Sequence, residues 1–145
     1  MNRYRSLYVH LFLPLLTLLV ASGCKSSELE VRVMGEPAMT NATRVRIYQL
    51  TGPSNFEAAR FEDLFRDDDA ALGSELLHKQ QVQIFPDQAQ TLLLSPVDDA
   101  QYIGFAADVR QPEGEAWRSL REMRDVRGRQ LNVIVGSGRL QVDVR

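Results

Sequence analysis

Two early stretches of the chain alternate between apolar and polar residues. Residues 28–34 alternate leucine or valine with charged side chains, and residues 44–50 begin with the same alternation. A period of two places every second side chain on one face, so each stretch is predicted to be a half-buried strand. Residues 35–43 contain Gly, Pro, Asn and two Thr and are predicted to be a loop. The two strands are expected to form a hairpin or a pair across two sheets.

The period changes after the second of these strands. Three phenylalanines and a leucine recur at helical spacing between residues 56 and 65, with charged residues among them. This pattern predicts a short amphipathic helix with Ser54 or Asn55 as its N-cap. A further helical turn is predicted over residues 68–72, ended by Gly73. The phenylalanines are expected to close one edge or end of the sheets.

The strand pattern returns after Leu77 and continues to the C-terminus. The predicted strands of this part cover residues 81–85, 90–94, 102–110, 130–135 and 139–144. The last two form a hairpin around Gly136-Ser137-Gly138. From Trp117 onward, arginines recur every three residues, which fits neither a strand nor a helix. Seven or eight short strands with a helical insertion predict a mainly β fold, a β-sandwich.

A basic and then apolar segment precedes the first predicted strand. Arg3 and Arg5 come before an apolar run over residues 11–21, after which small residues follow. This order is typical of an export signal. The run is shorter than the roughly 20 apolar residues that a membrane-spanning helix needs. Residues 1–23 are therefore predicted to be a signal peptide.

Cys24 follows this segment directly and is the single cysteine of the 145 residues. The sequence Ala21-Ser22-Gly23-Cys24 resembles the lipobox of bacterial lipoprotein signals. Lipidation accounts for an unpaired cysteine in an exported chain. We expect a diacylglycerol and an N-acyl chain on Cys24 and no other cofactor. Several acyl chains anchor a protein stably, whereas one chain holds it only marginally.

Lys25 predicts which membrane holds the anchor. By resemblance to the sorting rule of bacterial lipoproteins, a lysine in place of an aspartate after the cysteine points to the outer membrane. The domain then faces the periplasm. Residues 24–27 are expected to be a short tether, and residues 28–145 are long enough for one β-sandwich domain with a sizeable core.

Charge narrows the choice of partner. Without residues 1–23, the chain has 15 Lys and Arg against 19 Asp and Glu, a net charge of −4. Domains that bind nucleic acid usually carry a basic face or stripe. We therefore expect neither binding to nucleic acid nor electrostatic binding of basic side chains to anionic lipid.

Groups suited to catalysis or metal binding are few after residue 23. His78 is the single histidine of this part, and it is predicted to be a surface or sheet-edge residue. Asp67-Asp68-Asp69 begins like a calcium loop, but Leu72 and His78 stand where an EF-hand needs Gly and Glu. We interpret the three aspartates as residues that cap a helical turn. No enzyme activity and no metal site are expected.

Four segments carry a family resemblance. They are Val45-Arg46-Ile47-Tyr48-Gln49-Leu50, Leu72-Gly73-Ser74-Glu75-Leu76-Leu77, Tyr102-Ile103-Gly104-Phe105-Ala106-Ala107 and Ala116-Trp117-Arg118. In this order they resemble the type VI secretion lipoprotein family TssJ, also called SciN or VasD. The resemblance implies a transthyretin-like sandwich of two sheets. It also implies an outer-membrane subunit of the TssJ–TssL–TssM membrane complex, which anchors a contractile injection machine.

The resemblance further implies a partner and a contact site. In the family, the lipoprotein holds the periplasmic C-terminal domain of the inner-membrane protein TssM, and the loop between the first two strands contributes to the contact. Carried over to this chain, that loop consists of Gly35, Glu36, Pro37, Ala38, Met39, Thr40, Asn41, Ala42 and Thr43. We expect Met39 to be exposed, because its polarizable side chain suits a binding surface. Pro37 should restrict the loop and lower the entropy lost on binding.

Two other functions remain open at this point. A transthyretin-like or lipocalin-like carrier of a small ligand would show an apolar interior opening larger than packing requires. A pilotin-like lipoprotein would help to assemble another envelope structure. In each case, Tyr48, Phe105 and Trp117 are expected to be core residues, because aromatic side chains bury a large apolar area. Ser95–Gln101 is the second candidate for a contact loop.

Overall fold

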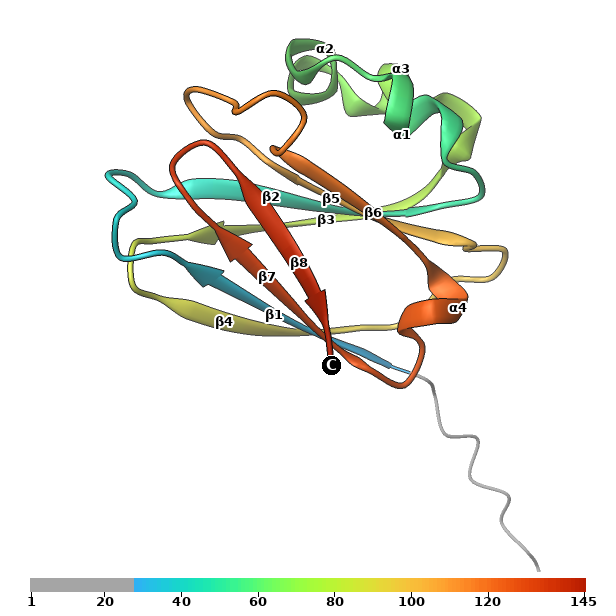
Figure 1. Cartoon of the computed structure of the whole chain (residues 1–145). Helices are drawn as coiled ribbons and strands as arrows, with labels where there is room; N and C mark the ends of the chain where they lie inside the picture. Colours follow the sequence, from blue (N-terminus) through green and yellow to red (C-terminus); the bar gives the residue numbers. More distant parts are fainter. Residues whose placement is uncertain (1–27) are drawn as a thin grey trace, which may run out of the picture.

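The structure, a computed structural model, describes residues 28–145 as two four-stranded sheets packed face to face (Figure 1). The strand order is β4-β1-β7-β8 in the first sheet and β3-β2-β5-β6 in the second. The predicted mainly β sandwich is therefore confirmed, with eight strands. The predicted signal peptide, residues 1–23, and the tether, residues 24–27, lie outside the described residues.

The first sheet contains β1 (Leu29–Gly35), β4 (Ala89–Leu94), β7 (Gln130–Val135) and β8 (Leu140–Val144). The second sheet contains β2 (Thr43–Leu50), β3 (Leu76–Ile84), β5 (Tyr102–Ala107) and β6 (Arg118–Glu122). The helical elements are α1 (Ser54–Ala58), α2 (Phe61–Arg66), α3 (Asp68–Leu72), a 3-10 turn (Gly73–Glu75) and α4 (Met123–Val126).

β1 and β2 belong to different sheets, so their connection crosses the sandwich and they do not form a hairpin. β1 is a central strand, antiparallel to β4 and parallel to β7. β2 is central in the other sheet, between β3 and β5. β5 ends at Ala107, before the predicted end at residue 110, because the Val109 amide turns back and donates to the Ala107 carbonyl.

The main core lies between the two sheets. Val31 and Val33 of β1 face it, as their alternation with charged residues predicts, together with Val133 of β7. Ile47 of β2 pairs with Phe105 of β5, and both are buried. The alternating sequence pattern thus identifies the inner faces of both sheets.

A second apolar layer lies on the outer face of the second sheet, which the helices α1, α2 and α3 cover (Figure 1). Phe56 of α1 packs there against Tyr48 of β2, with ring centroids 5.9 Å apart. A Cβ on Gly104 would lie 3.0 Å from the Phe56 ring, so the glycine leaves room for it. This cover explains why the last four residues of β2 are all buried and why the alternation ends there.

The helical segment differs from the single helix predicted between residues 56 and 65. It consists of two short helices separated by Ala59 and Arg60, where Ala59 has an extended backbone with ψ 134°. The expected caps are also wrong, since Pro53 precedes α1 and no side chain caps it. α3 does end at Gly73, whose φ of +54° explains the glycine.

The arginine-rich segment forms a strand followed by one helical turn, β6 and α4. All five residues of β6 are half-buried, so the two faces of the strand differ little in burial and no period is visible in the sequence. The predicted C-terminal hairpin is confirmed, with Val133 opposite Val142.

Candidate functional site

The predicted contact loop lies at one end of the sandwich. Gly35 ends β1 and Thr43 begins β2, so residues 36–42 form the connection. Figure 1 shows this connection at the left-hand end, whereas β1 begins at the right-hand end. We call the left-hand end the loop end.

Backbone hydrogen bonds tie the loop to two neighbouring turns. The Gly35 amide donates to the Gln88 carbonyl of the β3–β4 turn at 2.9 Å. The Glu36 amide donates to the Val135 carbonyl of β7 at 2.8 Å. Arg139, after the β7–β8 turn, forms a 3.3 Å ion pair with the Glu36 carboxylate. The β1–β2 loop, the β3–β4 turn and the β7–β8 turn therefore form one continuous surface at the loop end.

The loop itself is folded back on its own backbone. The Met39 amide donates to the Glu36 carbonyl at 3.1 Å, which closes a turn around Pro37 and Ala38. The Ser137 hydroxyl donates to the Ala38 carbonyl at 3.4 Å. A partner would meet a segment that is already ordered, which lowers the entropy cost of binding.

Met39 is buried, with 5% of its surface exposed, and the expectation that it is exposed is wrong. Its sulfur would lie 3.2 Å from a Cβ on Gly35, so the side chain fills the end of the core beside β1. The connection crosses the open end of the sandwich, and an apolar side chain that points inward there is removed from water. The other loop residues divide into exposed Pro37, Ala38, Thr40 and Asn41, half-buried Glu36 and Ala42, and buried Gly35 and Thr43.

A hollow of about 290 Å³ adjoins the loop, between residues 39–43 on one side and residues 108–110 with Ser137 on the other. Asp108 at its wall pairs with Arg44 at 2.8 Å. Arg110 is exposed and forms no ion pair with any residue from 28 to 145. This polar hollow offers hydrogen-bonding groups to a bound segment.

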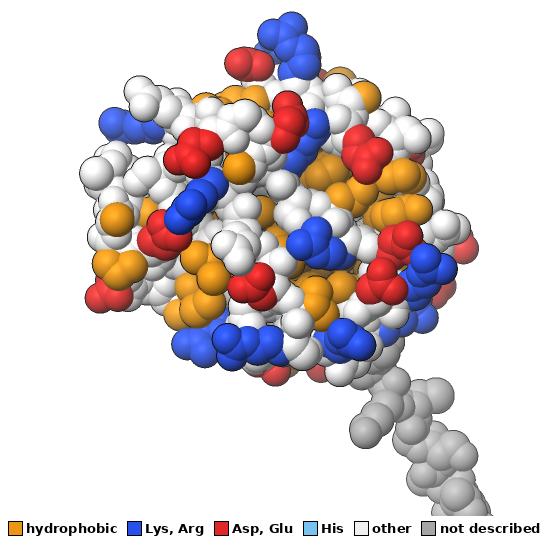
Figure 2. Space-filling model, in the orientation of Figure 1, with side chains coloured by type: hydrophobic (Ala, Val, Ile, Leu, Met, Phe, Trp, Pro, Cys, Tyr) orange, Lys and Arg blue, Asp and Glu red, His pale blue; other side chains and the backbone are white. Residues whose placement is uncertain are grey.

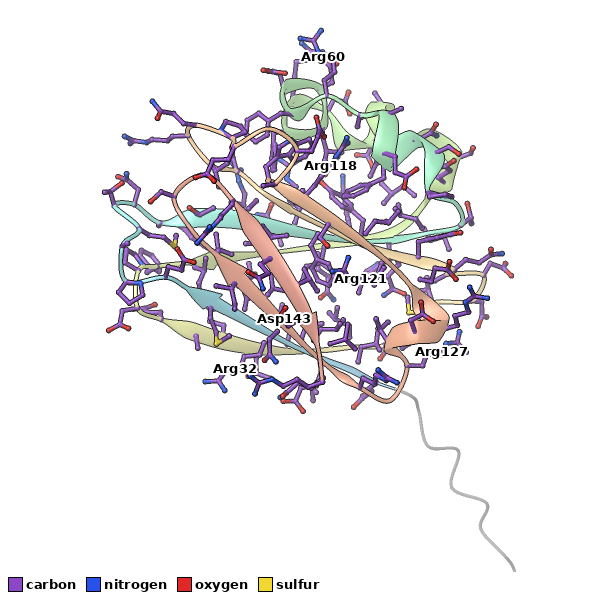
Figure 3. The ribbon with its side chains drawn as sticks, in the orientation of Figure 1. Arg32, Arg60, Arg118, Arg121, Arg127 and Asp143 are labelled. Atoms are coloured by element: carbon purple, nitrogen blue, oxygen red, sulfur yellow. The ribbon has the colours of Figure 1, made fainter. Side chains whose placement is uncertain are left out.

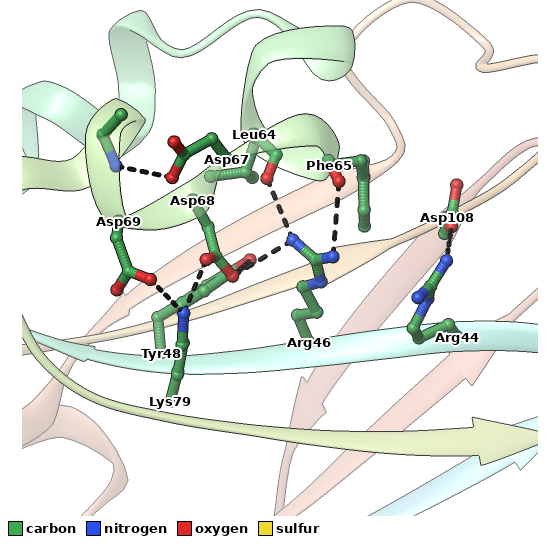
Figure 4. A network of polar contacts seen from close by, with 11 residues as sticks. Arg44, Arg46, Tyr48, Leu64, Phe65, Asp67, Asp68, Asp69, Lys79 and Asp108 are labelled. Atoms are coloured by element: carbon green, nitrogen blue, oxygen red, sulfur yellow. Dashed lines mark hydrogen bonds and ion pairs between the residues drawn. The ribbon is translucent and has the colours of Figure 1, made fainter.

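A second cluster of polar side chains lies beneath the helices, on the outer face of β2 and β3 (Figure 4). The Asp68 carboxylate pairs with Arg46 at 3.0 Å and with Lys79 at 2.7 Å, and it accepts a hydrogen bond from the Tyr48 hydroxyl at 3.1 Å. Arg46 also donates to the carbonyls of Leu64 and Phe65. These contacts hold α2 and α3 onto the sheet.

The ionisation of this cluster follows from its surroundings. Burial raises the pKa of the Tyr48 hydroxyl, which therefore remains protonated. Burial also disfavours the charged Asp68, but the hydrogen bond from Lys79 and the charges of Arg46 and Lys79 outweigh it and lower the pKa of Asp68. The hydrogen bonds to Asp68 and Asp69 raise the pKa of Lys79. Asp68 and Lys79 are thus charged at neutral pH, and the cluster is a structural clamp.

Arg118 forms a third polar connection, and Figure 3 shows it beneath the helices, whereas Arg60 extends from them into solvent. The Arg118 guanidinium donates to the carbonyls of Phe56, Glu57 and Ala59 at 2.5–2.8 Å. It also stacks on Trp117, 4.8 Å from the ring centroid. The carbonyls at the end of α1 have no hydrogen-bond donor within the helix, and Arg118 supplies the donors that they need.

Charges of both signs are spread over the face seen in Figure 2, with several Lys and Arg side chains along its lower edge. Within residues 28–145, no three His, Cys, Asp or Glu side chains are grouped so that they could hold a metal ion. No helix of these residues is long and apolar enough to cross a membrane. Cys24 and Lys25 lie outside the described residues.

Asp68 and Arg118 are structural residues that the sequence pattern does not identify. Asp67 acts as the predicted cap, since its carboxylate accepts from the Ala70 amide at 3.0 Å. The adjacent Asp68 is buried and paired with β2 and β3, which no local signal indicates. The residues that Arg118 binds lie about 60 positions earlier in the chain.

Comparisons with known proteins agree with this architecture. A family model described as "Type VI secretion lipoprotein, VasD, EvfM, TssJ, VC_A0113" matches residues 35–138. A comparison with curated protein sequences gives no match.

Several solved structures share this fold, among them the following three. The type VI secretion lipoprotein TssJ1 from Pseudomonas aeruginosa is 18% identical with a TM-score of 0.74, over 83% of this chain and 97% of that one. Serratia marcescens Lip, a membrane-bound component of the type VI secretion system, is 19% identical with a TM-score of 0.72, over 81% and 98%. A chain in the structure of the TssM C-terminal domain from EAEC is 19% identical with a TM-score of 0.71, over 80% and 97%.

At these identities the solved structures show the fold, and the family model shows the family, since it matches more than half of the chain. The match begins at the last residue of β1 and ends in the β7–β8 turn, so it includes the whole predicted contact loop. The chain belongs to the type VI secretion lipoprotein family, the family of VasD, EvfM and TssJ.

Proposed function

We propose that this protein is the outer-membrane lipoprotein of a type VI secretion membrane complex, with a structural and not a catalytic role. A diacylglycerol and an N-acyl chain on Cys24 anchor it, and its loop end holds the periplasmic domain of a TssM-like inner-membrane protein. The observation that carries the proposal is the position of the loop end relative to the start of β1, at opposite ends of the sandwich (Figure 1).

The length of β1 sets the distance between anchor and contact. Its seven residues span roughly 20 Å at about 3.3 Å per residue. Cys24 precedes Leu29, the first residue of β1, by five residues, which reach at most about 18 Å. A lipid on Cys24 therefore keeps the start of β1 near the membrane surface. The loop end is then directed away from the membrane, where the domain of an inner-membrane protein can reach it.

The family assignment and one similar structure support the choice of partner. The family description names a secretion lipoprotein, which agrees with the lipobox at residues 21–24. One chain with this fold lies in the structure described as the TssM C-terminal domain from EAEC. The carrier and pilotin alternatives have no comparable support, because the matching family belongs to type VI secretion.

The location is proposed from Lys25, the residue after the lipidated cysteine. With lysine at this position we expect the protein in the inner leaflet of the outer membrane, with residues 28–145 in the periplasm. Lys25→Asp should move the protein toward the inner membrane and leave lipidation intact. Density-gradient fractionation of cells checks this, and wild-type protein found in the inner membrane would contradict the proposed location.

The anchor is tested with Cys24→Ser. This variant should lose incorporation of labelled palmitate and leave the membrane fraction, because the acyl chains supply the binding energy. The circular dichroism of the released protein should match wild type, since residues 28–145 form a hydrophobic core of their own. Palmitate label that persists in Cys24→Ser would contradict lipidation at this residue.

The contact is tested by binding of the full lipidated chain, in detergent micelles, to the periplasmic domain of the TssM-like protein from the same organism. Ala38→Glu with Thr40→Glu adds charge at two exposed loop positions and leaves Met39 in place. We expect surface plasmon resonance to show affinity at least about tenfold lower, ~1.4 kcal/mol.

The matched control is Ser95→Glu with Gln101→Glu, two exposed positions in the connection that follows β4. This connection lies at the end where β1 begins, because Leu94 pairs with Leu29. Its affinity should remain within about twofold of wild type. Equal weakening by both variants would remove the loop end as the specific contact, and a wild-type chain that does not bind would contradict the proposed function.

A further inference from the structure

We infer that Phe85, in the β3–β4 turn, is the main apolar anchor of the surface that contacts the TssM-like periplasmic domain. The inference rests on the proposed function and adds to it a residue that lies outside the β1–β2 loop. It follows from what the loop lacks, from where Phe85 lies and from how its turn is held.

The loop exposes little apolar surface. Met39, its one large apolar side chain, is 5% exposed and already packed in the core. The exposed loop residues Pro37, Ala38, Thr40 and Asn41 are small or polar. Protein interfaces usually obtain most of their energy from a few large side chains that enter pockets of the partner. A contact at the loop end therefore needs an anchor from a neighbouring segment.

Phe85 is the large apolar side chain available there. Residues 28–145 contain three exposed large hydrophobic side chains, namely Phe85 (44% exposed), Leu93 (65%) and Leu77 (38%). Leu93 pairs with Glu30 near the start of β1, and Leu77 is the second residue of β3, so both lie toward the opposite end. Among the three, Phe85 alone adjoins the loop end.

The turn that carries Phe85 is fixed to the base of the loop. The Gln88 amide donates to the Phe85 carbonyl at 3.2 Å, and the Gln88 carbonyl accepts from the Gly35 amide at 2.9 Å. A Cβ on Gly35 would lie 2.3 Å from the Phe85 carbonyl oxygen, so only a glycine lets the loop and the turn approach this closely. The backbone of Phe85 is therefore ordered before a partner binds.

The chemistry of the partner follows from this surface. Phe85 requires an apolar pocket for a phenyl ring, which an aromatic or aliphatic cluster on the TssM-like domain would supply. Polar groups should surround that pocket, because the exposed Thr40 and Asn41 of the same loop end present hydroxyl and amide groups. An apolar centre within a polar rim is the usual arrangement of such contacts.

The experiment compares Phe85→Ser with Leu93→Ser in the full lipidated chain, again by binding to the TssM-like periplasmic domain. Both variants remove an exposed apolar side chain, and circular dichroism with thermal melting checks that both fold. We expect Phe85→Ser to weaken binding at least about tenfold, Leu93→Ser to stay within about twofold, and Phe85→Tyr to retain most of the affinity.

Three outcomes would overturn the inference. If Phe85→Ser binds within twofold of wild type while Ala38→Glu with Thr40→Glu weakens binding, Phe85 is not the anchor and the proposed function stands. If the wild-type chain does not bind, the proposed function fails and the inference fails with it. If the wild-type chain self-associates, and Phe85→Ser abolishes this while TssM affinity stays unchanged, the side chain serves a second copy of this protein.

Discussion

Arg46 of β2 and Asp68 of α3 form a 3.0 Å ion pair in which both side chains are largely buried, 14% and 10% exposed. The pair joins the sheet to the helices at a point where apolar packing also occurs. A buried charge that loses its partner is costly, so the two residues depend on each other. This cluster therefore sets how firmly α2 and α3 are held to β2.

Asp68→Asn should destabilise the fold by about 3 kcal/mol, because it leaves Arg46 without a counter-charge in a partly dry site. In this variant Arg46 still donates hydrogen bonds to the carbonyls of Leu64 and Phe65, which limits the loss of stability. Urea denaturation measures the change. Lys79→Met is the control, and since Lys79 is 43% exposed it should cost less than about 1 kcal/mol. Equal losses in the two variants would show that burial of the Arg46 pair has no special role.

The same carboxylate gives the stability a defined pH dependence. The fold lowers the pKa of Asp68 below its ordinary 3.8, so its contribution is present above about pH 4 and is lost as pH falls through the lower folded value. The difference in unfolding free energy between wild type and Asp68→Asn should therefore be constant from pH 5 to 7 and shrink below about pH 4. Urea titrations at several pH values check this, and a difference that grows in acid would contradict the lowered pKa.

Arg118→Lys should cost about 1–3 kcal/mol, although it preserves the charge. The guanidinium serves three carbonyls of the α1 segment at once, and a single ammonium group cannot reproduce that geometry. Thermal melting measures the loss, and faster hydrogen exchange in residues 54–60 locates it. Arg60→Lys is the matched control, because Arg60 is exposed and its ion pair with Glu62 is 3.9 Å long. A wild-type melting curve for Arg118→Lys would refute this role.

Gly35→Ala should destabilise the protein by about 1–3 kcal/mol, since the new methyl group would lie 2.3 Å from the backbone oxygen of Phe85. The backbone cannot yield as a flexible side chain can, so β1 and the β3–β4 turn must separate. Gly52→Ala is the control, because the nearest atom there is the carboxylate end of Glu75 at 3.2 Å. Differential scanning calorimetry compares the two, and a larger loss for Gly52→Ala would contradict the close approach.

The strands that face only one core could be predicted from the sequence. β1 alternates cleanly because its inner side chains are buried and Arg32 on the other face is exposed. β2 begins in the same way, but Arg46, which the alternation assigns to solvent, lies beneath the helices. A period of two distinguishes the faces of a strand and does not say what covers each face.

Contacts between distant segments could not be predicted. The helix divides at Ala59, where Arg118, far along the chain, binds the carbonyls of Phe56 and Ala59. The polarizable side chain of Met39 favoured an exposed position on a binding surface, yet this loop crosses between the sheets and its methionine enters the core. Neither the break in the helix nor the burial of Met39 can be predicted from the local sequence, because both depend on contacts between segments that are far apart in the chain.

The central position of β1 has a mechanical consequence. β1 bonds to β4 over six residue pairs on one side and to β7 over six on the other. A pull between the proposed lipid before β1 and the proposed partner at its end acts along the strand, perpendicular to the bonds of the antiparallel β4 ladder and oblique to the slanted bonds of the parallel β7 ladder. Such a load shears the bonds of both ladders together, whereas a load across an edge strand would open them one after another. A tether before Glu28, as proposed, would thus pull on a central strand of the first sheet and not on an edge strand that could peel away.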